Sequence, residues 1–180
     1  MRSLVVTGTT GGLGPTVVKR LEREYRLIAI THRQADLTSD SQVERAMSEA
    51  GEVYGAVHLV GGFDTDPNGW AKMMALNFTA AVNVLRHVRV ADGGRLVAIS
   101  SYASLTKPAG LGPYVASKSA LNAFVQTIAA EMRPRRITAN ALLPDDLASQ
   151  PMRDHVGEAI AFLLSDAAAN ITGALIPMLA

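Results

Sequence analysis

The sequence lacks cysteine, has no long hydrophobic run and carries almost no net charge. With no cysteine among 180 residues, disulfide bonds and thiolate zinc sites are excluded and a cytoplasmic location is favoured. No stretch approaches the ~18 consecutive apolar residues of a membrane span. The first apolar run, residues 4–6, does not resemble a secretory signal. A net charge of +1 indicates no polyanionic partner, so we expect a cytoplasmic protein that binds neither membrane nor nucleic acid.

The histidines and the one basic cluster receive no predicted function. His58 lies inside a buried strand pattern and His87 near a helix end, which is typical of structural or surface histidines. Histidine and carboxylate residues show no clustered metal-ligand spacing, so we expect no metal site. The basic cluster at residues 133–136, Arg-Pro-Arg-Arg, falls between a predicted helix and a predicted strand. We interpret it as a solvated turn rather than a nucleic-acid patch.

What the chain contains is an alternation of short β-rich runs and helical periods. A length of 180 residues with 48% hydrophobic residues is enough for one buried core, and no repeat or linker interrupts it. The alternation predicts a parallel sheet with helices on both faces, a Rossmann-like, doubly wound α/β/α domain spanning residues 1–180. The expected strands cover residues 4–7, 26–31, 56–60, 94–99, 138–142 and 174–178.

Helices are predicted between these strands. The first covers residues 15–25, with Pro15 in its first turn. Ser41 and Glu44 have the spacing of a capping box, which predicts the start of the second. The third carries a stripe at helical spacing, formed by Trp70, Met73, Met74, Asn77, Ala81 and Leu85. The fourth extends from Tyr114 to Met132, and the last covers residues 154–164.

The glycines after the first strand form a candidate phosphate loop. Gly8, Gly12 and Gly14 lie between a predicted strand and a predicted helix. In that order they allow a tight turn, close backbone approach to a pyrophosphate and close packing of the helix on the strand. A glycine pattern alone also fits a flexible turn, but the flanking elements favour dinucleotide binding.

A tyrosine and a lysine one helical turn apart form the second candidate site. Tyr114 and Lys118 are at positions i and i+4, so both lie on the same side of a helix and the ammonium is expected to favour the phenolate. A phenol has a reference pKa of about 10, so a base near neutrality needs roughly 3–4 kcal/mol of preferential phenolate stabilisation. Ser101 follows a predicted strand at its carboxyl end, where doubly wound sheets bind ligands. Taken singly, these residues also fit a loop start and a partly buried aromatic.

The spacing of these residues resembles the short-chain dehydrogenase/reductase family almost end to end. Thr7, Gly8, Gly12 and Gly14 fit its T-G-x-x-x-G-x-G loop, and Asn77, Ser101, Tyr114 and Lys118 fit its catalytic tetrad. Further similar segments lie at residues 36–37, 60–62, 140–144, 162–166 and 172–173. The resemblance implies an NAD(P)-dependent oxidoreductase that interconverts a carbonyl and a secondary alcohol, such as a ketone or 3-oxoacyl reductase.

The resemblance also implies a role for each site residue. Tyr114 exchanges the proton, Ser101 holds the reacting oxygen, Lys118 holds the nicotinamide ribose, and Asn77 anchors a water linked to Lys118. The cofactor-binding candidates are Gly8, Thr10, Gly11, Gly12, Leu13, Gly14, His32, Arg33, Asp36, Leu37, Gly61, Gly62, Tyr114, Lys118, Pro144, Leu147 and Ser149. Ser149 falls where a hydroxyl of the family meets the nicotinamide carboxamide.

The choice of cofactor is predicted from the end of the second strand. In the resembling family an acidic residue there grips the adenosine ribose diol, and this chain has His32 and Arg33 instead. Arg33 can pair with a 2′-phosphate, with help from His32 when protonated, which favours NADP over NAD. An ordinary exposed arginine after a strand is the alternative interpretation.

Two segments are shorter than in the resembling family. The residues from the second strand to Asp36 are too few for a crossover helix and another strand, so we expect a trimmed sheet edge. The segment from Pro144 to the last helix is too brief for the usual substrate lid. The substrate is then bulky or carrier-bound, the site is open and slow, or a neighbouring subunit supplies the cover. The resemblance implies a homodimer or homotetramer.

Two other functions remain open at this stage. The first is a nucleotide-binding regulatory or scaffold protein that keeps the phosphate loop without turnover. The second is an epimerase or dehydratase built on the same scaffold. An intact tetrad favours the oxidoreductase over the regulatory protein, because a binder has no need for Tyr114 and Lys118 in register.

Overall fold

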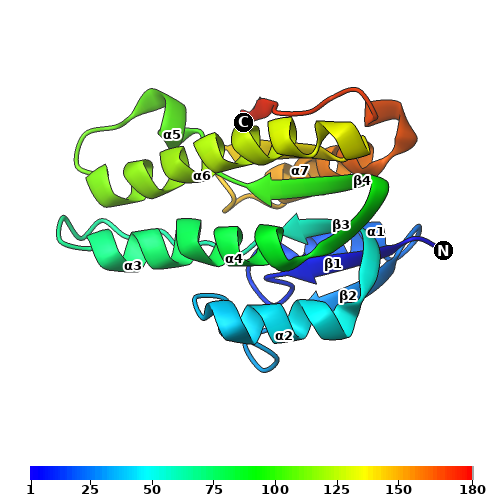
Figure 1. Ribbon diagram of the computed structural model, residues 1–180. Helices are drawn as coiled ribbons and strands as arrows, with labels where there is room; N and C mark the ends of the chain where they lie inside the picture. The colour runs from blue at the N-terminus through cyan, green and yellow to red at the C-terminus, as the bar shows by residue number, and fades with distance from the viewer. Residues whose placement is uncertain (180) are drawn as a thin grey trace.

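A computed structural model describes residues 1–179 and contains one parallel sheet of six strands (Figure 1). The strands lie in the order β2-β1-β3-β4-β5-β6, and every neighbouring pair is parallel. Their bounds are β1 Ser3–Thr7, β2 Arg26–Ile30, β3 Glu52–His58, β4 Arg89–Ile99, β5 Thr138–Pro144 and β6 Leu175–Met178. The six predicted strands and the doubly wound α/β/α fold are confirmed.

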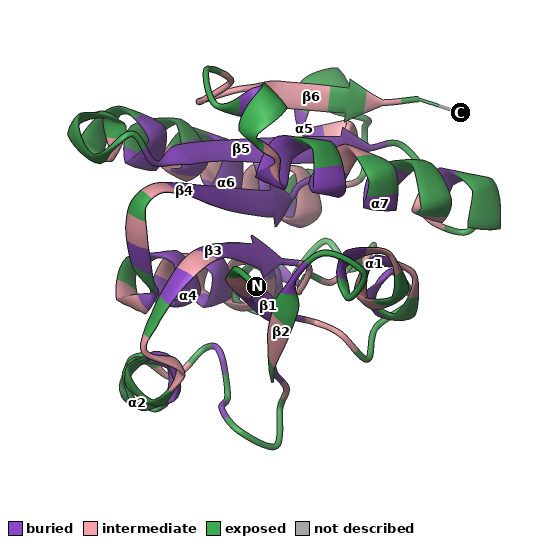
Figure 2. Ribbon diagram, turned by 90° about the vertical axis from the view of Figure 1, so that its right-hand side faces the viewer, coloured by how far each residue is buried: buried purple, intermediate pink, exposed green. Residues whose placement is uncertain are grey.

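Helices cover both faces of the sheet. The layer formed by α1 (Gly14–Leu21) and α7 (Gln150–Leu164) lies on one face. The opposite layer contains α2 (Asp40–Ala50), α4 (Ala80–His87) and α6 (Gly112–Glu131). Figure 2 shows the two layers on either side of the buried strands. Shorter elements are α3 (Trp70–Met74), the π-helical turn η1 (Ala75–Thr79), α5 (Ala103–Thr106), η2 (Arg133–Arg135) and η3 (Asp166–Ala168).

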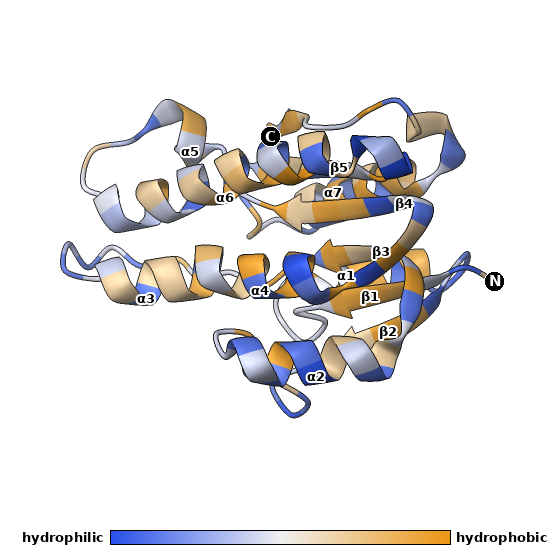
Figure 3. Ribbon diagram, in the orientation of Figure 1, coloured by the Kyte–Doolittle hydropathy of each residue, from blue (hydrophilic) through white to orange (hydrophobic). Residues whose placement is uncertain are grey.

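The sheet separates two hydrophobic cores, and the strand sequences explain why. Successive side chains of a strand point to opposite faces. Accordingly, Leu4 and Val6 pack with α1 and α7, whereas Val5 between them packs with α2, α4 and α6. Because both faces are covered, the strands read as continuous apolar runs rather than as alternating patterns (Figure 3). These runs made the strands recognisable in the sequence.

Several predicted helix starts and ends are wrong. The capping box at Ser41 is absent, since α2 begins at Asp40 and Ser39 occupies its N-cap position with an extended backbone. The first helix ends at Leu21 rather than at residue 25. The last helix begins at Gln150, before the predicted start at residue 154, because the Ser149 hydroxyl accepts a hydrogen bond from Met152 N.

The third predicted helix is divided. Its stripe is buried at Met73, Asn77, Ala81 and Leu85, but Trp70 is half exposed and residues 75–79 form the π-helical turn η1. A π-helical turn inserts an extra residue into the helical repeat, which spacing alone does not reveal.

The two predicted short segments are confirmed. No strand lies between β2 and α2, so β2 forms one edge of the sheet in the part of the chain that is described. Residues 145–149 alone connect β5 to α7. The sheet therefore keeps its central strands, while its β2 edge and the connection after β5 are short.

Candidate active site

The predicted site residues gather at the carboxyl ends of the central strands. The arrowheads in Figure 1 point toward this edge of the sheet. The glycine loop follows β1, the Gly61–Gly62 turn follows β3, Ser101 follows β4, and Pro144 ends β5. Strand order reverses between β1 and β3, since β2 lies on one side of β1 and β3 on the other. Doubly wound sheets bind ligands at this kind of switch point.

The glycine loop is tight at two positions and open at a third. Gly8 has a φ of +78°, and a Cβ there would lie 3.0 Å from Leu59 C. A Cβ on Gly14 would lie only 2.2 Å from Thr9 O, so this position admits no larger residue without moving the loop. A Cβ on Gly12 would meet nothing within 4 Å. The loop thus packs closely against the protein and leaves its backbone at Gly12 accessible, which fits a diphosphate group.

A cavity of about 270 Å³ adjoins this loop. Five predicted residues line it, namely Gly8, Thr10, His32, Asp36 and Leu37, together with Ile30, Thr31, Ala35, Thr38, Val60, Leu76 and Ala80. The Asp36 carboxylate accepts hydrogen bonds from the backbone and hydroxyl of Thr38, and these bonds lower its pKa. The walls are mostly apolar with a few polar groups, which suits an adenosine moiety.

Arg33 and Ser149 lie outside the cavities of the site. Arg33 is exposed after β2 and does not line the cavity that His32 lines. Ser149 is exposed and caps α7. The structure therefore gives Ser149 a helix-capping role that accounts for its hydroxyl without a ligand.

Asn77 lies fully buried in the π-helical turn η1. Its Oδ1 accepts a hydrogen bond from Gly62 N at 2.8 Å, and its Nδ2 donates to Gly62 O at 3.0 Å and to Ser117 Oγ at 3.0 Å. The side chain thus fixes the turn after β3 to helix α6. Ser117 was not identified from the sequence, although it stands within the Tyr114–Lys118 segment.

Lys118 is buried, and its ammonium binds the end of β4. Its Nζ donates to Ile99 O at 3.0 Å, and burial lowers its pKa from 10.5 to about 8. A Cβ on Gly61 would lie 2.8 Å from Lys118 Nζ and 2.9 Å from Asn77 Oδ1. Both polar groups therefore lie against Gly61, where only glycine leaves room for them.

Tyr114 and Ser101 are joined by a side-chain hydrogen bond. Burial raises the pKa of Tyr114, and the bond with Ser101 partly offsets that rise. The Lys118 ammonium is directed to Ile99 O and the net shift of the Tyr114 pKa is upward. Tyr114 is thus held as the neutral phenol, the form that can donate a proton. That Lys118 and a cationic nicotinamide ring together make this phenol more acidic stays a prediction.

Two cavities of about 350 and 300 Å³ open onto these hydroxyl groups. Phe63, Ser101, Tyr114 and Asp145 line both of them. The predicted residues Pro144 and Leu147 line the second. Phe63 was missed from the sequence; its ring meets that of Tyr114 edge to face, with centroids 5.0 Å apart. Its position directly after the Gly61–Gly62 turn is the signal that points to it.

A buried histidine lies beneath the site. His58, at the end of β3, is fully buried, and its Nδ1 lies 2.9 Å from the Thr7 hydroxyl of β1. Burial, and then the charge of Lys118, lower the pKa of His58 to about 3. His58 is therefore neutral near pH 7 and links the two strands at the switch point.

Within residues 1–179, no helix is both long and apolar enough to cross a membrane, and no group of three or more histidine or acidic side chains is placed to hold a metal ion.

Comparison with known proteins gives consistent matches along the chain. A family model described as short chain dehydrogenase matches residues 16–160. The 3-oxoacyl-[acyl-carrier-protein] reductase MabA of Mycobacterium avium is 25% identical over 98% of this chain and 88% of its own length. The crystal structure of lin1944 from Listeria innocua has a TM-score of 0.87 at 18% identity and covers 98% of this chain and 99% of its own. A blue fluorescent protein from a metagenomic library, solved in complex with NADPH, has a TM-score of 0.84 at 23% identity, with 98% and 95% coverage.

Proposed function

Because this chain belongs to the short chain dehydrogenase family and is an NAD(P)-dependent oxidoreductase, we propose that it reduces a carbonyl group to a secondary alcohol with NADPH. The observation that carries the proposal is the hydrogen bond between Ser101 and Tyr114 at the mouth of two cavities. A proton donor and a second hydroxyl then face the same bound oxygen.

The residues that would hold the cofactor form a continuous path. The glycine loop offers backbone amides to the diphosphate, the cavity lined by His32 and Asp36 takes the adenosine, and Lys118 faces the nicotinamide half. The bound nicotinamide supplies the hydride. Lys118 has three N–H donors, one of which binds Ile99 O, so two remain for ribose hydroxyls.

The chain's own contribution to the chemistry is a proton and its positioning. As the carbonyl carbon gains a hydride, the oxygen gains the proton of Tyr114, whose raised pKa keeps the phenol protonated beforehand. Ser101 Oγ accepts a hydrogen bond from Ala103 N at 3.2 Å, so its one hydroxyl hydrogen is left for Tyr114 or for a bound oxygen beside it. Ser101 thereby orients the reacting oxygen.

Asn77 is proposed as a positioning residue. Its amide is engaged with Gly62 and Ser117, so it fixes the turn against which Lys118 Nζ lies rather than contacting substrate. The predicted water anchored by Asn77 stays a prediction.

The proposed substrate is a ketone, with 3-oxoacyl thioesters as the first class to test. Support comes from the name of the mycobacterial relative and from the brief connection at residues 145–149, which leaves the cavities lined by Tyr114 without a helical cover. A long or carrier-bound acyl chain can extend from such a site into solvent.

The decisive experiment is NADPH oxidation with a panel of ketones, aldehydes and 3-oxoacyl thioesters. Tyr114→Phe is expected to lower kcat about 10²–10⁴-fold while leaving the NADPH Kd unchanged, and Tyr25→Phe, on the other side of the molecule, serves as the matched control. If the parent turns over none of the panel and Tyr114→Phe binds cofactor identically, a regulatory nucleotide-binding protein is favoured instead. Products formed without net cofactor oxidation would indicate an epimerase or dehydratase.

A homodimeric or homotetrameric state and a cytoplasmic location remain predictions from the sequence. Light scattering of the purified protein and cell fractionation test them separately from the reaction.

A further inference from the structure

A second large cavity lies far from the candidate active site. It has a volume of about 770 Å³ and lies at the amino ends of the strands, the opposite edge of the sheet. We call it the amino-end cavity. It is lined by Arg2, Tyr54, Asp92, Gly93, Arg95, Arg133, Arg136, Ile137, Thr138, Ala169, Asn170 and Thr172. Volumes of this size accommodate small-molecule ligands.

The lining of the amino-end cavity is strongly basic. It contains four arginines and one acidic residue, Asp92. The Asp92 carboxylate already binds Arg135 at 2.8 Å, so the carboxylate of Asp166, which pairs with Arg2 and Arg95, is the one that offsets part of the charge of the four arginines. Because the whole chain carries a net charge of only +1, this concentration of positive charge is local.

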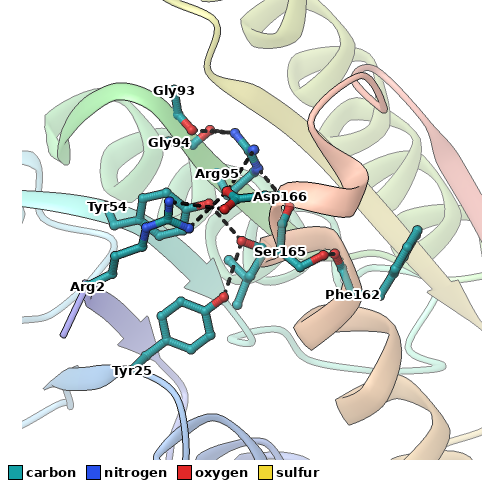
Figure 4. A network of polar contacts seen from close by, with 10 residues as sticks. Arg2, Tyr25, Tyr54, Gly93, Gly94, Arg95, Phe162, Ser165 and Asp166 are labelled. Atoms are coloured by element: carbon teal, nitrogen blue, oxygen red, sulfur yellow. Dashed lines mark hydrogen bonds and ion pairs between the residues drawn. The ribbon is translucent and has the colours of Figure 1, made fainter.

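Arg95 is a buried cation fixed at the cavity wall. Figure 4 shows its guanidinium directed to the backbone oxygens of Gly93 and Gly94, the latter at 3.0 Å from Nη1. Its Nη2 lies 3.9 Å from Asp166 Oδ1, a carboxylate that Arg2 binds at 2.9 Å. Both guanidinium groups lie over the Tyr54 ring. This network holds the two arginines in place before any ligand arrives.

The other two arginines have no such partners. The side chains of Arg133 and Arg136 make no hydrogen bond or ion pair within residues 1–179. Arg136 has a left-handed backbone with a φ of +56°, a conformation that glycine and asparagine adopt with less strain. An unpaired, strained arginine at a cavity wall is a candidate for ligand contact.

A buried polar atom in the same wall also lacks a partner. Thr138 begins β5 and lines the cavity, and its Oγ1 is buried with no hydrogen bond among the described residues. Buried hydroxyl groups are usually satisfied, so an unsatisfied one calls for a partner such as a water or an ion.

We infer that the amino-end cavity binds a small molecule carrying a diphosphate or closely spaced phosphates, held by Arg133 and Arg136 at its rim and by the fixed charges of Arg2 and Arg95 at its wall. Guanidinium groups bind phosphate oxygens in bidentate pairs. The concave shape and limited volume favour a small molecule over nucleic acid, which needs an extended basic face.

The test is calorimetric titration of inorganic pyrophosphate into the full chain, with and without saturating NADPH. NADPH occupies any diphosphate site at the glycine loop, so binding that persists reports a second site. The double variant Arg133→Gln/Arg136→Asn removes both rim charges, and asparagine tolerates the left-handed backbone. Arg45→Gln/Arg86→Gln removes two exposed arginines of α2 and α4 as the charge-matched control.

We expect pyrophosphate binding to persist with NADPH present, to weaken about tenfold or more in the rim variant, and to stay unchanged in the control. Binding abolished by NADPH, or equal in the rim and control variants, would overturn the inference. Tighter, rim-dependent binding of a duplex oligonucleotide than of pyrophosphate would overturn the small-molecule assignment. Unchanged thermal unfolding of the rim variant shows that any loss is not a folding defect.

Discussion

Lys118 Nζ lies 3.0 Å from the carbonyl oxygen of Ile99, the last residue of β4. In return, the hydroxyl of Ser100 donates to the carbonyl oxygen of Lys118 at 3.4 Å. These two bonds run in opposite directions between helix α6 and the end of β4. They hold the first turns of α6, including Tyr114, above the strand end that carries Ser101.

The burial of Lys118 predicts a pH-dependent gain of stability. Its folded pKa of about 8 lies below the ordinary lysine pKa of 10.5, so between these values the unfolded chain binds more protons and stability rises with pH. We expect the difference in unfolding free energy between the parent and Lys118→Met to change by up to about 1.4 kcal/mol per pH unit in that window, in favour of the parent. Urea unfolding of both proteins across this pH range checks the prediction. Unfolding free energies that change with pH in the same way for the parent and Lys118→Met would contradict it.

His58 predicts a loss of stability in acid. Its pKa falls from 6.5 to about 3 on folding, so the unfolded state binds the extra proton between those values and stability drops as pH falls through the window. We expect His58→Gln to show a shallower acid unfolding profile than the parent, by up to about 1.4 kcal/mol per pH unit. His155→Gln, which changes an exposed histidine of helix α7, is the matched control.

Alanine substitutions at two glycines of the loop should differ in their effect on stability, although both weaken cofactor binding. Gly14→Ala places a Cβ 2.2 Å from Thr9 O, so we expect a stability loss of about 1–3 kcal/mol together with weaker NADPH binding. Gly12→Ala adds its methyl group in open space, so we expect near-parent stability with weaker NADPH binding. Thermal unfolding and cofactor titration of both variants check this. Equal stability of the two would contradict the geometry.

The Asn77 side chain should contribute strongly to stability, because it makes three hydrogen bonds. Asn77→Ala leaves Gly62 N, Gly62 O and Ser117 Oγ without their partner. We expect a loss of about 2–4 kcal/mol, against about 1–2 kcal/mol for Ser117→Ala, which removes one of these bonds and the bond that the Ser117 hydroxyl donates to Tyr114 O. Denaturant unfolding measures both, and a loss no greater than that of Ser117→Ala would contradict this account.

Arg33 should distinguish the two nicotinamide cofactors. If its guanidinium binds the 2′-phosphate, Arg33→Ala weakens NADPH binding about tenfold or more and leaves NADH binding unchanged. Arg26→Ala, at the start of the same strand β2, is the control. Equal loss for both cofactors would remove the argument for NADP.

The fold could be predicted because its strands are buried on both faces and stand out as apolar runs, as residues 4–6 of β1 and 96–99 of β4 illustrate. Helix ends were less predictable, because they depend on single capping contacts. Ser149 extends α7 by one turn, and spacing could not reveal that its hydroxyl binds Met152 N.

The site was predictable as a set of positions and not as a set of contacts. Helical spacing correctly puts Tyr114 and Lys118 in one helix, but it says nothing about where a long side chain ends, and the ammonium binds Ile99 O. The amino-end cavity was not predictable at all. Its arginines come from three separate segments, so only the folded chain turns the cluster at residues 133–136 into part of a basic cavity.

The reduced edge of the sheet has a consequence for self-association. As an edge strand, β2 leaves one row of backbone N–H and C=O groups without a neighbouring strand in the described part of the chain, and such a row can template strand addition by another molecule. β2 is only five residues long and begins with the exposed charge of Arg26, features that discourage strand addition. Because the shortened crossover leaves β2 at the edge of the sheet, the exposed charge of Arg26 opposes intermolecular β-sheet growth there.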